Sequence, residues 1–222
     1  MSGQGTLLPF YAICDVSASM RESERVDALN EAVAATCDAV AINPVVADRI
    51  RLSIISFSTE AEVDLPLCDL GMLDRIPRLR PRGLTSYAAA FRRLRTVIED
   101  DVAQLVADGY RVFRPAAFFL TDGRPTDRNA DWRAAHADLV DADFPHRPNV
   151  VSFGLGDADH AVLTEVATVA SYAASDAVTA ATAIASFGTL LVESVVASGA
   201  AGHFRLPAEL PTSLVELDGD LL

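Results

Sequence analysis

The stretch TLLPFYAICDVSAS, residues 6–19, decides the expected fold class of this 222-residue chain. Its first ten residues, Thr6 to Asp15, form a continuous apolar run, which is typical of a strand buried on both faces. The run ends in an aspartate that is followed by two serines. In α/β proteins, ligands bind beyond the carboxyl ends of such strands, so this polar cluster is the first place to look for a site.

The rest of the chain alternates between strand and helix patterns. Further strands are predicted at 51–58, 61–65, 116–121, 149–154 and 171–174, and helices at 26–40, 86–108, 131–142, 160–168 and 177–198. Strands that alternate with helices form mostly parallel sheets covered on both faces. We therefore expect an α/β, doubly wound, mostly parallel six-stranded sheet with helices on both faces. Residues 61–65 follow the preceding strand closely enough to form one antiparallel edge strand.

Composition narrows the classes of partner. Half of the residues are hydrophobic, which is enough to form a packed core. The formal net charge is −13, which disfavours binding to nucleic acid or to an anionic membrane. All 18 basic residues are arginine. Cys14, Cys37 and Cys68 form no CxxC pair and are expected to be reduced thiols. Together with an amino terminus that lacks a basic signal region, they predict a cytoplasmic protein.

The expected organisation is one domain with short ends. An N-terminal arm (1–5) precedes the domain (6–199), and a proline- and acid-containing C-terminal tail (200–222) follows it. Residues 177–202 carry a single charge, Glu193, and are long enough to span a membrane. They consist largely of Ala, Ser, Thr and Gly, which partition weakly into hydrocarbon, so a buried closing helix is favoured over a membrane span.

Three polar clusters follow predicted strands or precede a helix: residues 15–19, 83–86 and 121–127. Each has an ordinary structural explanation when taken alone. Ser19 with Glu22 fits a capping box, Thr85 can cap the helix that it precedes, and Asp122-Gly123 is a common turn dipeptide. Only the combination of the three clusters is specific.

That combination, Asp-x-Ser-x-Ser, then Gly-x-Thr, then Thr-Asp-Gly, resembles the metal-ion-dependent adhesion site (MIDAS) of von Willebrand factor A (vWA) domains. Residues 7–198 resemble in particular the bacterial tellurium-resistance-associated, TerY-like group, which carries stretches similar to RLSIISFS and TDGRPTD. Ala18 departs from the glycine of many vWA domains, at little cost unless that backbone requires a positive φ. By this resemblance the metal ligands are Asp15, Ser17, Ser19, Thr85 and Asp122.

These residue types suit a hard cation, because Mg²⁺ prefers six oxygen ligands. The expected cofactor is Mg²⁺, with Mn²⁺ or Ca²⁺ as alternatives. Asp15 and Asp122 would balance the two charges of the metal and leave one position for a Glu or Asp of a partner. Without metal the two carboxylates should repel each other by about 3 kcal/mol at about 6 Å.

The leading hypothesis is a non-enzymatic, metal-dependent interaction module that binds a protein partner through an acidic side chain. The resemblance implies a bacterial stress-response or tellurium-resistance setting, alongside a protein kinase and a PP2C-type phosphatase. The sequence contains no P-loop, no GxSxG elbow and no catalytic Cys-His pattern, and we assign no catalytic residue. The alternatives are a metal-dependent hydrolase and a structural α/β domain without a metal role.

Overall fold

The structure is a computed structural model that describes residues 5–217, apart from the side chains of Ser23 and Val45. Most of the expected N-terminal arm and the end of the expected tail lie outside these residues. In the described part of the chain, the sheet has eight strands in the order β3-β2-β1-β5-β6-β7-β8, with β4 paired to the start of β1. The strands are β1 Thr6–Asp15, β2 Ile50–Phe57, β3 Ala61–Cys68, β4 Arg111–Val112, β5 Ala116–Thr121, β6 Asn149–Gly154, β7 Ala170–Ala174 and β8 Leu214–Glu216.

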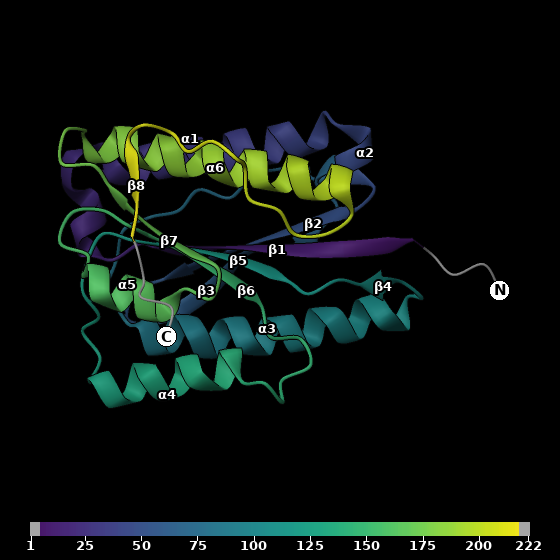
Figure 1. Cartoon of the computed structure of the whole chain (residues 1–222), viewed down its shortest axis with the longest axis horizontal. Helices are drawn as coiled ribbons and strands as arrows, with labels where there is room; N and C mark the ends of the chain where they lie inside the picture. The colour runs from purple at the N-terminus through teal and green to yellow at the C-terminus, as the bar shows by residue number, and fades with distance from the viewer. Residues whose placement is uncertain (1–4, 218–222) are drawn as a thin grey trace.

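Helices cover both faces of this sheet (Figure 1). On one face lie α1 (Arg25–Ala41), α2 (Pro44–Ala47) and α6 (Ala180–Ala201); on the other lie α3 (Tyr87–Ala107), α4 (Asn129–Val140) and α5 (His160–Val166). Two short 3₁₀ segments, η1 (Ala18–Glu24) and η2 (Leu70–Met72), connect the layers. The predicted doubly wound, mostly parallel architecture is therefore confirmed.

Alternation along the central strands explains the two cores. In β1, Phe10 and Ala12 pack toward α1 and α6, whereas Tyr11 and Ile13 pack toward α3 and α4. All four side chains are buried, as the continuous apolar run predicts for a strand covered on both faces. Burying apolar surface on both sides is the main stabilising contribution to such a sheet, at about 25 cal/mol per Å².

Two details of the predicted sheet are wrong. The sheet has eight strands instead of six, and it has an antiparallel strand at each edge, β3 beside β2 and β8 beside β7. Consequently residues 170–174 form an interior strand between β6 and β8. The strands that were missed, β4 and β8, have two and three residues, too few for an alternating pattern to show.

The expected domain boundary also shifts. Helix α6 continues to Ala201, and β8 pairs with β7, so residues 200–216 belong to the domain instead of a loosely attached tail. Among the described residues, α6 is the one helix long and apolar enough to cross a membrane, with half of its most apolar window buried. It packs along α1 and contributes Ile184, Phe187 and Leu191 to the core, which agrees with a closing helix.

The order of strands places the predicted site. The chain runs from β1 to β2 on one side and later returns to β5 on the other side, so the switch in strand order falls between β1 and β5. Ligands of open α/β sheets bind at this point, beyond the carboxyl ends of the strands. Asp15 ends β1, and Asp122 directly follows the end of β5.

Candidate metal centre

Asp15 is held rigidly at the end of β1. It is fully buried, and its two carboxylate oxygens accept hydrogen bonds from the Ser17 backbone N–H (2.7 Å) and the Thr121 hydroxyl (2.6 Å). Burial raises the pKa of Asp15 to about 6, although both hydrogen bonds act to lower it. The carboxylate is therefore oriented but carries a desolvation penalty at neutral pH.

A chain of oxygen atoms connects the first polar cluster with the third. The Ser17 and Ser19 hydroxyls lie 2.9 Å apart, and Ser19 donates to Asp122 Oδ1 at 2.7 Å. Ser17 precedes η1, but its side chain caps no backbone N–H there, and Ser19 lies inside η1 with its hydroxyl donated to Asp122, so the capping box expected for Ser19 and Glu22 does not form. The structure thus brings four of the five predicted ligands together across two strands.

Thr85 reaches the same edge through a tight loop. Gly83 has a φ of +64°, and a Cβ at this position would lie 2.6 Å from Thr59 Oγ1, so the position requires glycine. The Gly83 carbonyl accepts from the Ala18 N–H (3.1 Å), and the Thr85 carbonyl accepts from the Thr126 N–H (2.8 Å). These bonds tie the second cluster to the first and the third.

Thr85 does not cap α3, which is the structural role that the sequence allows for it. Ser86 caps α3 by accepting from the Ala89 N–H, and Asp127 accepts from the Ser86 hydroxyl and the Ala88 N–H. The Thr85 side chain is buried and faces Gly123, where an added Cβ would lie 3.7 Å from Thr85 Oγ1. Its hydroxyl therefore remains available to the site.

Sequence reasoning missed Thr121 and Arg25. The sequence motif includes Thr121 but does not reveal its role, which is to donate from β5 to the Asp15 carboxylate. Arg25 Nη1 forms an ion pair with Asp122 Oδ2 at 2.7 Å. The Asp122 side chain is fully buried and that of Arg25 is only 16% exposed, so solvent screens this pair weakly.

Arg25 reaches Asp122 because of the turn that precedes it. Glu24 adopts a φ of 61°, in the left-handed region, and is the one non-glycine residue with positive φ in the described part of the chain. Such a conformation costs about 1–2 kcal/mol and turns the chain from η1 into α1. Arg25 is the first residue of α1 and is directed toward the end of β5.

Arg25 changes the charge balance expected from the sequence. The prediction counted two carboxylates against a divalent cation and expected them to repel when no metal is bound. With Arg25 in contact with Asp122, the three charged groups sum to −1, and the repulsion between the carboxylates is partly offset. A divalent cation would bring this sum to +1, so the loaded centre would attract one further negative charge.

The donor set fits a hard cation. Hydroxyls of Ser17, Ser19 and Thr85 and the carboxylates of Asp15 and Asp122 offer only oxygen, as Mg²⁺, Mn²⁺ and Ca²⁺ prefer. No group of three or more His, Cys, Asp or Glu within residues 5–217 could hold a metal ion. Any cation at this edge would therefore depend on the hydroxyls of Ser17, Ser19 and Thr85 in addition to the two carboxylates.

Comparison with known proteins identifies the family of the chain. The von Willebrand factor type A domain family matches residues 10–124, slightly more than half of the chain. The chain belongs to this family. Members of the vWA family commonly mediate metal-dependent protein interactions and are generally interaction modules instead of enzymes. A search of curated proteins gave no match.

Solved structures show the same fold at low identity. A von Willebrand factor type A protein from Catenulispora acidiphila superposes with a TM-score of 0.64 at 17% identity, over 86% of this chain and 43% of that one. The pilus adhesin SpaC of Lactobacillus rhamnosus GG gives 0.65 at 13%, over 86% and 31%. Proximal thread matrix protein 1 of the mussel byssus, solved with a zinc-occupied MIDAS motif, gives 0.57 at 15%, over 87% and 49%. This vWA domain spans less than half the length of each of these chains.

Proposed function

We propose that this vWA domain is a divalent-metal-dependent adaptor that binds an acidic side chain of a protein partner. The observation that carries the proposal is the charge of the centre. Asp15, Asp122 and Arg25 sum to −1, so a divalent cation leaves +1, which one Asp or Glu carboxylate neutralises. When bound, the cation would supply a Lewis-acidic position for that carboxylate, held by Ser17, Ser19, Thr85 and the two aspartates.

The surroundings of the site favour binding over catalysis. Both oxygens of Asp15 accept hydrogen bonds, and both oxygens of Asp122 contact Ser19 or Arg25. Each carboxylate is thus fixed in orientation and keeps lone pairs for a cation, and a carboxylate that ligates a cation does not also act as the general base that a hydrolase would need. Leu84, between Gly83 and Thr85, is 61% exposed and offers the partner an apolar contact beside the metal.

The proposed setting follows the sequence resemblance to TerY-like proteins. We propose a bacterial, cytoplasmic protein of a stress-response or tellurium-resistance system, working alongside a protein kinase and a PP2C-type phosphatase, with Mg²⁺ as the physiological cation. The strongly acidic composition supports a protein partner over nucleic acid or a membrane surface.

Partner capture tests the proposal. Immobilised wild-type protein and Ser17→Ala are each exposed to lysate with Mg²⁺ or with EDTA. Ser194→Ala is the matched control, because Ser194 is a buried serine on α6 whose hydroxyl donates to Leu190. We expect specific partners only with wild type or Ser194→Ala in Mg²⁺, and elution by an excess of a glutamate peptide. Equal capture in every condition would rule out a metal-bridged complex.

A further inference from the structure

The guanidinium of Arg25 has an unused hydrogen-bonding edge. Nη1 is paired with Asp122, whereas Nε is buried without any partner among the described residues, and no bond from Nη2 to them is observed. A buried donor without a partner destabilises the fold, because it has lost its hydrogen bonds to water. Structures rarely leave one unless a ligand or water satisfies it.

The unused edge is the one that binds carboxylates. Elsewhere in this protein, Arg133 donates from Nε and Nη2 to the two carboxylate oxygens of Glu165. Arg128 presents the same two nitrogens to Asp131. Arginine forms its strongest pairs with planar anions in this two-bond geometry. Arg25 offers the same donors without an acceptor.

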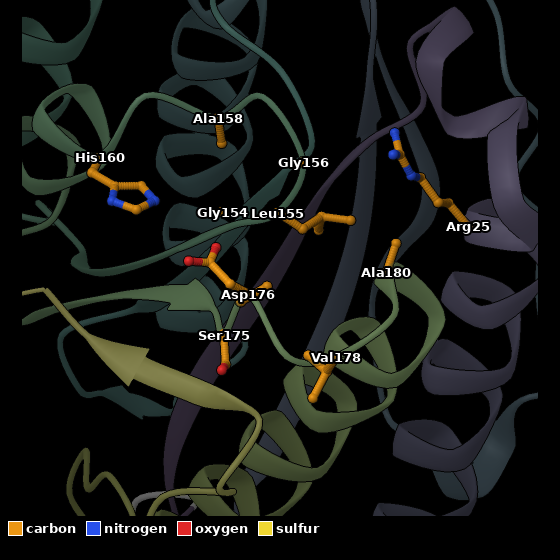
Figure 2. A pocket seen from close by; sticks show the side chains of 11 residues that line it. Arg25, Gly154, Leu155, Gly156, Ala158, His160, Ser175, Asp176, Val178 and Ala180 are labelled. Atoms are coloured by element: carbon orange, nitrogen blue, oxygen red, sulfur yellow. The ribbon is translucent and has the colours of Figure 1, made fainter.

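A cavity of about 260 Å³ lies beside this guanidinium (Figure 2). Its walls come from the ends of β6 and β7 (Gly154 and Ala174), from the turn after β6 (Leu155 and Gly156) and from the start of α6 (Ala180). Figure 2 shows Arg25 at one side, and Asp176 and His160 across the cavity from it. The cavity opens on the same edge of the sheet as the metal centre, since it is built on the carboxyl ends of neighbouring strands.

Gly156 allows the turn to pass close to the arginine. Its φ is +61°, and a Cβ there would lie 3.1 Å from the Asp122 carbonyl and 3.6 Å from Arg25 Nη2. A glycine at this position lets the turn pass within van der Waals distance of the Arg25 guanidinium. The cavity and the arginine are therefore parts of one arrangement.

The walls select the chemistry of the ligand. The Nε–Nη2 edge of Arg25 favours a planar anion. The first turn of the 22-residue helix α6 adds a partial positive charge at Ala180. Asp176 on the far side disfavours a doubly charged anion such as phosphate and favours a hydrogen-bond donor there. The volume lies below the range of about 300–1,000 Å³ of pockets for drug-sized ligands, which suits a single side chain better than a nucleotide.

We infer that this cavity is a carboxylate-binding subsite, in which the Nε–Nη2 edge of Arg25 holds a second acidic side chain of the partner. The inference rests on the proposed function, in which a first acidic side chain occupies the metal. Because Arg25 contacts Asp122 on one side and the cavity on the other, the two carboxylates would be neighbours. The partner is then a protein segment with two closely spaced Asp or Glu residues.

The subsite is tested first without metal. In EDTA, the Arg25 Nε–H signal, assigned by its loss in Arg25→Lys, is followed by NMR during titration with acetyl-glutamate-amide. We expect a saturable shift that is absent in Ala180→Met, which fills the cavity without touching the ion pair. A shift that persists in Ala180→Met, no shift at all, or tighter binding of inorganic phosphate would each overturn the assignment.

The second arm separates the subsite from the metal. In Mg²⁺, the affinity of acetyl-Glu-Glu-amide is compared with that of the two peptides in which one Glu is replaced by Gln. We expect Arg25→Lys, which keeps a charge for Asp122 but lacks the Nε–Nη2 edge, to weaken the Glu-Glu peptide at least tenfold. The Gln-containing peptides should change less than twofold, as should all three peptides with Arg78→Lys, an exposed control.

The outcomes of the two arms are distinguishable. Loss of the Mg²⁺ dependence with the Nε–H shift retained would contradict the proposed function and leave the subsite standing. Binding of the Glu-Glu peptide that depends on Mg²⁺ but not on Arg25 would overturn the subsite alone. Binding of acetyl-glutamate-amide in the cavity without any gain from the linked second glutamate would assign the subsite to a free carboxylic acid instead of a partner segment, and would overturn the partner assignment.

Discussion

Replacing Asp15 by asparagine should stabilise the metal-free protein. The change preserves the shape of the side chain and its hydrogen bonds. The introduced Oδ1 can accept from the Ser17 N–H, and the introduced amide can donate to the Thr121 hydroxyl. Thr121 can then donate to the Gly123 carbonyl, which already lies 3.2 Å away. The substitution therefore removes a buried charge and keeps both hydrogen bonds, while the second amide N–H gains no assigned acceptor, which reduces the gain in stability.

The magnitude follows from the pKa of Asp15. Burial raises it from 3.8 to about 6, and each pKa unit corresponds to about 1.4 kcal/mol, so the ionised carboxylate costs the folded state about 3 kcal/mol at pH 8. Because the pKa is raised on folding, the folded state holds its proton where the unfolded state has lost it. The free energy of unfolding of the wild-type protein therefore falls, relative to that of Asp15→Asn, as the pH rises from about 4 to above 6.

Chemical denaturation in EDTA at pH 4.5 and pH 8 measures the effect. We expect Asp15→Asn to exceed wild type by about 2–3 kcal/mol at pH 8, and by less than 1 kcal/mol at pH 4.5. In Mg²⁺ the wild-type protein should gain stability by ligand binding and the variant should gain less. Asp48→Asn, which removes an exposed charge, is the control. A variant that is less stable than wild type in EDTA at pH 8, or a difference that does not change with pH, would refute the reasoning.

Three further predictions concern the supports of the site. Asp122→Asn should destabilise the metal-free protein by about 1–3 kcal/mol in denaturation, opposite in sign to Asp15→Asn, because it weakens the pair with Arg25; no loss would mean that the pair contributes nothing. Gly83→Ala should cost at least about 2 kcal/mol, through a positive φ and contact with Thr59, whereas Gly5→Ala, whose added Cβ meets nothing, should cost less than about 0.5 kcal/mol. Burial lowers the pKa of His136 below 6.5, so its contribution to stability is present above pH 6.5 and is lost as the pH falls below 6.5 toward the pKa of the folded state. His136→Gln should therefore lose less stability than wild type between pH 7.5 and 5.5, and an identical loss would assign the effect to other groups.

The central strands could be predicted because a strand that is buried on both faces is apolar at nearly every position. The bounds of β1, β5 and β6 agree with the predicted ranges, since strands covered on both faces read as uninterrupted apolar runs. Strands β4 and β8 leave no such trace. Two or three residues show no period, and these segments become strands only because β1 and β7 offer them free backbone groups.

Some residues of the site could also be predicted from the sequence and others could not. Asp15, Ser17, Ser19 and Asp122 could be named because their order in the chain resembles the MIDAS pattern, and the meeting of strand ends at one edge of a parallel sheet brings them together. Arg25 could not, because its role depends on the left-handed turn at Glu24 and on a contact across 97 residues. In a chain with 18 Lys and Arg residues, nothing distinguishes this arginine from the solvated ones.

Calorimetric titration with Mg²⁺ or Mn²⁺ tests the central claim most directly. The account predicts one bound cation per chain in wild type and in Ser194→Ala, and binding at least tenfold weaker in Ser17→Ala, whose hydroxyl serves no cap and lies between the two aspartates. The absence of binding and of any thermal shift in wild type at millimolar cation, or equal binding in Ser17→Ala, would contradict it. The first result would leave a structural α/β domain without a metal role, and the second would place the cation at another site.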